Sequence, residues 1–181
     1  MKKIIIFAFG LVLLLCLSSS AQQAYQSGSW HIDGQIYYSK YTGSEYADID
    51  QAQAKILMGK SIFSGFFVGA SLNIDYQKYN RSKDSMWLLG PFFKYYFIHK
   101  NSDKFEGVSI SPFFQLGVSA GRKDSYSAAS LESVIGFNTL LNQSIGIEIG
   151  VKGSLDYFQG DRGGGTGGGR IIAGAGLSVF L

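Results

Sequence analysis

A run of alternating side chains between residues 66 and 77 constrains the fold of this chain more than any other feature of its sequence. The apolar positions of the run are Val68, Ala70, Leu72, Ile74 and Tyr76. The positions between them carry Gly, Ser, Asn, Asp and Gln. A period of two over about 10 to 12 residues predicts a β-strand with one apolar and one polar face. Such a strand must turn one face to the protein interior and the other to its surroundings.

The same alternation recurs along the chain and predicts eight strands in all. The expected strands cover residues 30–39, 51–59, 66–77, 86–97, 108–120, 131–139, 144–157 and 171–181. Connections 60–65 and 140–143 are short, whereas polar loops follow the first, third, fifth and seventh strands, the last being the glycine-rich segment 158–169. Eight strands of about 10 residues with this alternation favour an all-β fold, an eight-stranded antiparallel up-and-down transmembrane β-barrel.

The alternation alone does not decide which face is inside, because a soluble calycin-like barrel would turn the apolar face inward. Three features favour lipid on the outside. The apolar faces end in aromatic residues, as interface girdles do. The polar faces are rich in Gly and Ser, and their charges have both signs. The charged residues expected in the interior are Asp33, Lys55, Asp75, Lys94, Glu132, Glu148, Lys152 and Asp156.

The interior of an eight-stranded barrel is only wide enough to be filled by side chains. We therefore expect these charged groups to pair with one another as a structural polar network, because a buried charge without a partner is costly. A continuous narrow channel remains the alternative.

The first 21 residues have the pattern of a secretory signal peptide. A short basic start is followed by an apolar run from Ile4 to Leu17 and by a small-x-small site at Ser19 and Ala21. The prediction is a cleaved segment 1–21 and a barrel domain 22–181. An uncleaved anchor would need about 20 apolar residues, and a lipoprotein signal would need a small residue before Cys16 in place of Leu15.

Composition supports a barrel rather than spanning helices. Charged residues make up 16% of the chain, against about 25% in ordinary globular proteins. Residues 22–181 contain no apolar run near 18 residues, and a closed barrel satisfies its backbone without one. The formal charge of +3 falls to +1 without Lys2 and Lys3, which gives no case for nucleic-acid binding. Cys16 is the only cysteine, so the expected mature chain has no disulfide and no thiolate ligand.

Residues 90–97, Gly-Pro-Phe-Phe-Lys-Tyr-Tyr-Phe, carry a resemblance to a known family. The stretch resembles the Gly-Pro-Phe-x-Arg/Lys-Tyr-Tyr-Phe pattern of the outer-membrane β-barrel-domain family of Gram-negative bacteria, small barrels similar to the OmpA and OmpX transmembrane domains. Segments 58–72 and 136–148 also look like that family. The resemblance implies a cell outer-membrane location, contact with outer-membrane lipid and lipopolysaccharide, and recognition by the barrel-insertion machinery. It implies no catalytic residues. Such barrels usually end in Phe, whereas here Leu181 follows Phe180.

Candidate chemical sites are few. The glycine-rich run 161–170 lacks the Gly-Lys-Ser/Thr ending of a phosphate-binding loop, and no helix pattern follows it. His31 and His99 lie on opposite parities and far apart, so neither a metal site nor a cofactor is expected. Barrel enzymes that modify lipid A need a His, a Ser and an acid near the membrane edge. His31 is expected to point inward, so we expect no enzyme.

Three functional hypotheses follow. The first is a monomeric outer-membrane barrel with a structural or surface-interaction role, four exposed loops and a filled polar lumen. The second is a narrow, porin-like pore or a small-solute-binding barrel that uses the charged lumen. The third is a soluble periplasmic binding barrel.

Overall fold

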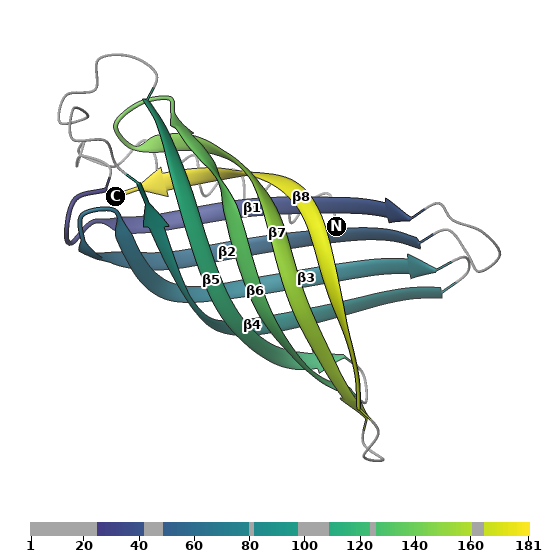
Figure 1. The fold of residues 1–181 in the computed structure, drawn as a ribbon. Helices are drawn as coiled ribbons and strands as arrows, with labels where there is room; N and C mark the ends of the chain where they lie inside the picture. The colour runs from purple at the N-terminus through teal and green to yellow at the C-terminus, as the bar shows by residue number, and fades with distance from the viewer. Residues whose placement is uncertain (1–24, 42–48, 80–81, 98–108, 124–125, 161–164) are drawn as a thin grey trace.

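The computed structural model describes residues 25–41, 49–79, 82–97, 109–123, 126–160 and 165–181, and they form one closed antiparallel barrel (Figure 1). The strands are β1 (Trp30–Tyr41), β2 (Ile49–Phe63), β3 (Phe66–Tyr79), β4 (Ser82–Tyr96), β5 (Ser109–Lys123), β6 (Tyr126–Leu140), β7 (Ile145–Gly160) and β8 (Gly165–Phe180). Each strand pairs with the next, and β8 pairs with β1. The predicted fold class is confirmed. The expected signal segment lies outside the described residues.

The structure corrects the expectation for the glycine-rich segment, which is shorter as a loop than the sequence suggested. Residues 158–169 were expected to form a loop, but β7 continues to Gly160 and β8 already begins at Gly165. Glycine weakens a strand because it loses much backbone entropy and has no side chain to pack. Here β7 supplies a paired neighbour for Gly165, Gly167, Gly168 and Gly169 of β8. The Tyr157 side chain also lies against Gly165 and leaves no room for a Cβ there.

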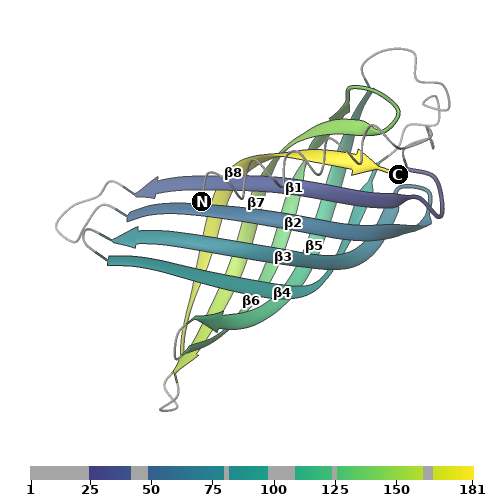
Figure 2. The same cartoon turned by 180° about the vertical axis from the view of Figure 1, so that it is seen from behind.

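The two ends of the barrel differ in their connections. At one end, called the turn end, Ser64 and Gly65 join β2 to β3, and residues 141–144 join β6 to β7. Gly65 has φ 78°, the left-handed conformation that glycine adopts without steric cost. The other end, called the loop end, is where β1 leaves toward β2 and β7 toward β8. Towards the loop end, strands β1–β4 and strands β5–β8 run in diverging directions, which Figures 1 and 2 show from opposite sides.

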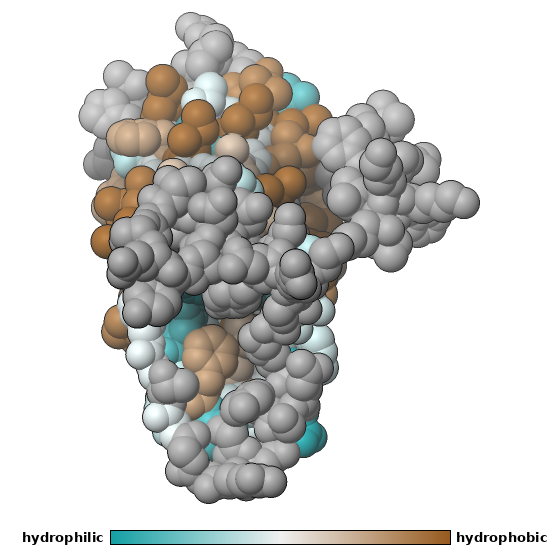
Figure 3. Space-filling view, turned by 90° about the vertical axis from the view of Figure 1, so that its right-hand side faces the viewer, coloured by the Kyte–Doolittle hydropathy of each residue, from teal (hydrophilic) through white to brown (hydrophobic). Residues whose placement is uncertain are grey.

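The two faces of the barrel wall have opposite character. Large apolar side chains point outward, and Ile36 on β1 and Ile149 on β7 are each 65% exposed. Charged side chains on the same strands, such as Asp33 and Glu148, are buried inside. Figure 3 shows one side of the molecule, on which apolar residues gather in the upper part of the described surface. The barrel is therefore apolar outside and polar inside. Among the described residues, no helix has the length and apolar character needed to cross a membrane.

Candidate functional site: a charged barrel interior

The barrel brings the eight charged residues expected in the interior to its inner surface. Each is at most 6% exposed. They come from β1, β2, β3, β4, β6 and β7 and are Asp33, Lys55, Asp75, Lys94, Glu132, Glu148, Lys152 and Asp156. Their contacts divide them into three clusters along the barrel axis.

The first cluster, nearest the turn end, is centred on Lys94. Its Nζ lies 2.7 Å from Asp33 Oδ2 and 2.5 Å from Glu148 Oε2. The Tyr96 hydroxyl donates a hydrogen bond of 2.5 Å to Glu148 Oε1. Gln35 Nε2 donates to Asp33 Oδ2 at 2.7 Å and to Glu148 Oε2 at 3.2 Å. These charge-assisted contacts hold two carboxylates around one ammonium group.

The second cluster lies midway along the barrel and has the opposite composition. The Glu132 carboxylate accepts from Lys55 and, at 3.3 Å, from Lys152 Nζ. Lys152 also donates to the side-chain oxygen of Gln53. The Lys152 ammonium group lies 5.2 Å from the centre of the Tyr37 ring, within the range of a cation–π contact. Two ammonium groups thus share one carboxylate.

The third cluster, nearest the loop end, is centred on Arg170 of β8. Its Nε lies 2.6 Å from Asp156 Oδ2, and its Nη1 lies 2.9 Å from Asp75 Oδ2. Gln51 Nε2 donates to both oxygens of Asp75, and Ser130 donates to Asp156. The Arg170 side chain is 19% exposed, whereas the partners in the other two clusters are at 2% or less.

The charges alternate along the axis. Glu148, Lys152 and Asp156 follow one another on β7 from the turn end to the loop end, one in each cluster. Counted formally, the first and third clusters carry two carboxylates for one cation, and the middle cluster carries two cations for one carboxylate. Because neighbouring clusters have opposite net charge, each also stabilises the next.

One group of side chains has the spacing of a metal site. His31, Asp33 and Glu148 can each place a ligand atom within 4.8 Å of the others. In the described part of the chain, His31 Nδ1 and Asp33 Oδ1 have no hydrogen-bond partner. However, Lys94 Nζ already lies between the two carboxylates and supplies their positive charge. A metal ion there would face an ammonium group in a water-poor interior, where like charges repel strongly.

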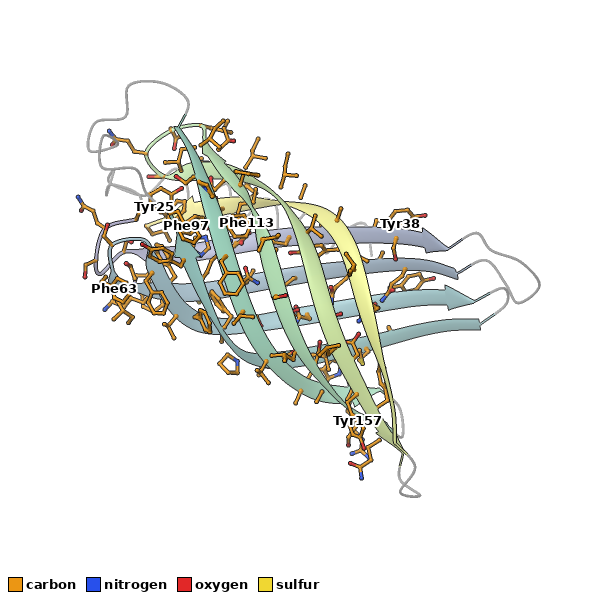
Figure 4. The ribbon with its side chains drawn as sticks, in the orientation of Figure 1. Tyr25, Tyr38, Phe63, Phe97, Phe113 and Tyr157 are labelled. Carbon is orange, nitrogen blue, oxygen red and sulfur yellow. The ribbon has the colours of Figure 1, made fainter. Side chains whose placement is uncertain are left out.

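The turn end of the interior is closed by an apolar cluster. Its members are Tyr25, Phe67, Tyr96, Phe113, Val134, Leu140 and Phe180. The Tyr25 ring lies 4.7 Å from that of Tyr96 and 4.9 Å from that of Phe180, within the range of aromatic pairs. Figure 4 labels Tyr25 and Phe113, which lie toward this end. Burial raises the pKa of the Tyr25 phenol. The cluster separates the charged interior from the turn end.

A small cavity lies beside the first cluster. A cavity of about 10 Å³ lies between Gln35, Tyr37, Glu148 and Gly174. That volume accommodates about one water molecule. The interior between these four residues is therefore closely packed.

A second apolar cluster faces inward toward the loop end. Met86 and Leu88 of β4 pack with Ala128 of β6, and Phe158 of β7 covers them. The interior is consequently not polar throughout, because apolar side chains line its β4–β7 side near the loops.

Aromatic side chains also gather on the outer surface near both ends. Figure 4 shows Phe63 and Phe97 at the turn end, and Tyr38 and Tyr157 at the loop end. All four are more than half exposed. Outward aromatic residues in two such bands are typical of the interfaces of a membrane barrel.

Several members of the network escaped the sequence-based prediction. Arg170 ends the glycine-rich run 161–170 and lay outside the expected strands, although it has the parity of the inward-facing residues of β8. Gln35 and Tyr96 were not singled out because they carry no charge. The parity of each residue, extended to polar and aromatic side chains, would have identified all three.

This chain shares its fold, but no matching sequence, with the known proteins compared. No family model matches the sequence, and no curated protein does. The crystal structure of Neisserial surface protein A (NspA) matches with a TM-score of 0.59 and 12% sequence identity, covering 84% of this chain and 99% of that chain. The crystal structure of the outer membrane protein OprG from Pseudomonas aeruginosa matches with a TM-score of 0.48 and 13% identity, covering 87% and 97%. The second similarity is too low to support an argument. This chain is a closed eight-stranded barrel with a fold similar to that of NspA.

Proposed function

We propose that this protein is a small outer-membrane barrel with a structural or surface-interaction role, a lumen filled by polar side chains and loops exposed at one end. One observation supports the proposal most strongly. Large apolar side chains face outward from the barrel wall, and paired charges face inward. A water-soluble barrel would have the reverse arrangement, because a continuous exposed apolar surface is unfavourable in water.

The backbone of such a barrel suits a membrane. Every strand has a paired neighbour on each side along much of its length, and the sheet closes on itself. Closure leaves few backbone groups without a partner, which is a requirement in hydrocarbon. The outward aromatic bands would lie at the two interfaces, and the apolar belt between them would contact the lipid tails.

We propose a location in the outer membrane on two grounds. The sequence carries the pattern of a cleaved signal peptide over residues 1–21, and the fold resembles that of a protein described as a Neisserial surface protein. Outer-membrane lipid, lipopolysaccharide and the barrel-insertion machinery are the partners that this proposal implies, with the barrel as a monomer. Membrane fractionation and heat-modifiable gel mobility test it. If the protein is found in the soluble fraction, the membrane location is excluded and the soluble binding barrel is favoured.

The filled lumen favours a structural or interaction role over a pore. Lys94 with its two carboxylates and the aromatic cluster at the turn end stand in the way of ions. We expect no steady single-channel current from the purified protein in planar lipid bilayers. Steady currents would contradict the filled lumen and favour a narrow pore. The proposal is also a non-enzymatic one, because His31 is fully buried behind Phe67 and Phe180 and out of reach of a lipid substrate.

A further inference from the structure

The charged side chains of the barrel are sorted between its two surfaces. Among the side chains that the structure describes, every carboxylate points inward, together with the four cations that pair with them. Lys60 and Arg122 are the described charged side chains on the outer face, and both are cations. The described outer face is therefore positive wherever it carries a charge.

Each of these outward cations lies directly opposite a tryptophan on the neighbouring strand. Lys60 of β2 pairs with Trp30 of β1 at the turn end, and Arg122 of β5 pairs with Trp87 of β4 at the loop end. Trp30 and Trp87 are the two tryptophans of the chain. Indole rings and the charged ends of long cationic side chains lie at the level of lipid head groups. The two pairs therefore mark the two levels at which the barrel wall can bind an anion of the membrane.

Arg122 belongs to a row of outward side chains with hydrogen-bonding groups. The pairing continues from Arg122 to Ser127 on β6, and from Ser127 to Gln159 on β7. Trp87, Arg122, Ser127 and Gln159, called the loop-end row, thus cross four neighbouring strands, and all four are exposed. Within the described part of the barrel, the side chains of Arg122, Ser127 and Gln159 make no ion pair or hydrogen bond. Their donor groups are available to a ligand.

The loop-end row directly follows an apolar row of the outer face. On its turn-end side the same strands supply Leu89, Ala120, Ala129 and Tyr157. Figure 4 labels Tyr157 at the loop end, and Gln159 lies two positions further along β7. Two positions in a strand correspond to about 7 Å. The loop-end row therefore lies where the apolar belt and its aromatic band give way to the head groups.

Lys60 at the turn end has different neighbours. Beyond Lys60, β3 supplies Val68 and β4 supplies Phe93, and both side chains are apolar and exposed. The Lys60 Nζ lies 6.0 Å from the centre of the Trp30 ring, within the range of a cation–π contact. An ammonium group is a point charge, whereas a guanidinium group can bind a phosphate through two parallel hydrogen bonds. The turn end therefore offers an anion a charge alone, and the loop-end row adds directed donors.

We propose that the loop-end row binds the head group of a phosphorylated glycolipid. The inference rests on the proposed membrane location, and it gives the lipopolysaccharide named there a binding site on the barrel wall. Arg122 binds a phosphate, Ser127 and Gln159 hydrogen-bond to sugar hydroxyls, and Trp87 packs against the ligand beside the phosphate. Neighbouring strands are about 4.8 Å apart, so the row is about 14 Å wide. The small head group of a glycerophospholipid would occupy Arg122 and leave Gln159 to water.

Titration with lipid A, a phosphorylated disaccharide lipid, tests this site. In a Trp30→Phe variant reconstituted in phosphatidylcholine vesicles, Trp87 emission reports binding at the loop end. The measured quantity is the mole fraction of lipid A that gives half of the emission change. Arg122→Gln should raise it about 10- to 100-fold, as expected when hydrogen bonds to a charged group are lost. Arg122→Lys should fall between, because it keeps the charge without the two-point geometry.

Lys60→Gln is the matched control, because it removes the cation beside the other tryptophan. It should leave the lipid A titration of Trp87 unchanged. Equal half-points for the Arg122→Gln and Lys60→Gln variants would overturn the proposal.

Two further lipids separate the phosphate from the sugar. Phosphatidylglycerol has a phosphate and no sugar ring, and dephosphorylated lipid A has the sugars alone. Both should bind several-fold more weakly than lipid A. Ser127→Ala combined with Gln159→Ala should weaken lipid A binding several-fold and leave phosphatidylglycerol binding unchanged. If phosphatidylglycerol binds as tightly as lipid A, the glycolipid is the wrong occupant. If dephosphorylated lipid A binds as tightly, the role given to Arg122 is wrong.

Quenching by brominated phosphatidylcholine, in vesicles without lipid A, keeps this test separate from the proposed function. Strong quenching of Trp87 in every variant shows that the barrel is inserted, so that a lipid A titration unaffected by Arg122→Gln overturns this site alone. If brominated lipid does not quench Trp87, the membrane location itself is overturned.

Discussion

The turn-end half and the loop-end half of this barrel hold their charges in different ways. At the turn end, Lys94 and its two carboxylates are fully enclosed, next to an aromatic cluster and within a wall in which β1 and β8 are paired. At the loop end, Arg170 is partly exposed and bridges strands that are not all paired. The comparison indicates that the turn-end half is held by enclosed ion pairs and backbone pairing together, whereas the loop-end half depends more on an ion pair that water can reach.

The largest effect is expected from Lys94→Met, which leaves Asp33 and Glu148 buried without their cation. Removing one partner of a buried ion pair costs about 3–5 kcal/mol. Urea unfolding in vesicles, followed by tryptophan fluorescence, measures the loss. Lys60→Met is the matched control, because Lys60 is exposed on the outer face, and surface changes cost within about 0.5 kcal/mol.

A rescue variant sharpens the same prediction. Adding Asp33→Asn and Glu148→Gln to Lys94→Met removes all three charges, and much of the lost stability should return. If Lys94→Met and Lys60→Met unfold at the same urea concentration, the turn-end cluster is not buried as described.

A somewhat smaller effect is expected from Phe180→Ala, which opens the aromatic cluster. Truncating a buried Phe costs about 3 kcal/mol through lost burial and the cavity left behind. Ile149→Ala is a control on the neighbouring strand, because its side chain points outward. Urea unfolding in vesicles measures the stability. Bilayer conductance shows whether ions now pass the aromatic cluster. An unchanged unfolding midpoint would place Phe180 outside the barrel.

The smallest effect of the three is expected from Arg170→Gln. Asp75 keeps its hydrogen bonds from Gln51, and Asp156 keeps the one from Ser130. Partial exposure also allows water to solvate the carboxylates. We expect a loss of about 1–2 kcal/mol, between the values of exposed and buried pairs. The same urea titration measures it. A loss as large as that of Lys94→Met would remove the distinction between the two halves.

The eight strands could be predicted from the sequence because alternation of apolar and polar residues is a local property, and each strand of a membrane barrel shows it. The segment Gly165–Gly169 escaped the prediction because four of its five residues are glycines, which have no side chains to alternate. Its strand is stabilised by pairing with β7, which is a property of the neighbour and not of the segment.

The interior was less accessible to prediction. Parity places a residue inside or outside, but it does not say which charges meet across the barrel. The contacts of Lys94 with β1 and β7, and of Arg170 with β3, depend on the register and tilt of strands far apart in the sequence. The aromatic cluster was missed for a related reason. Phe67 and Phe113 lie on polar faces, where an apolar side chain contributes to the pattern only as an exception.

Two tryptophans allow the central claim, that the apolar face of the barrel contacts lipid, to be tested directly. Trp30 near the turn end and Trp87 toward the loop end are the only tryptophans of the chain, and both point outward. In vesicles that contain brominated lipids, single-tryptophan variants that retain Trp30 or Trp87 should both be strongly quenched, whereas aqueous acrylamide should quench them weakly. Strong quenching by acrylamide and none by brominated lipid would contradict the claim.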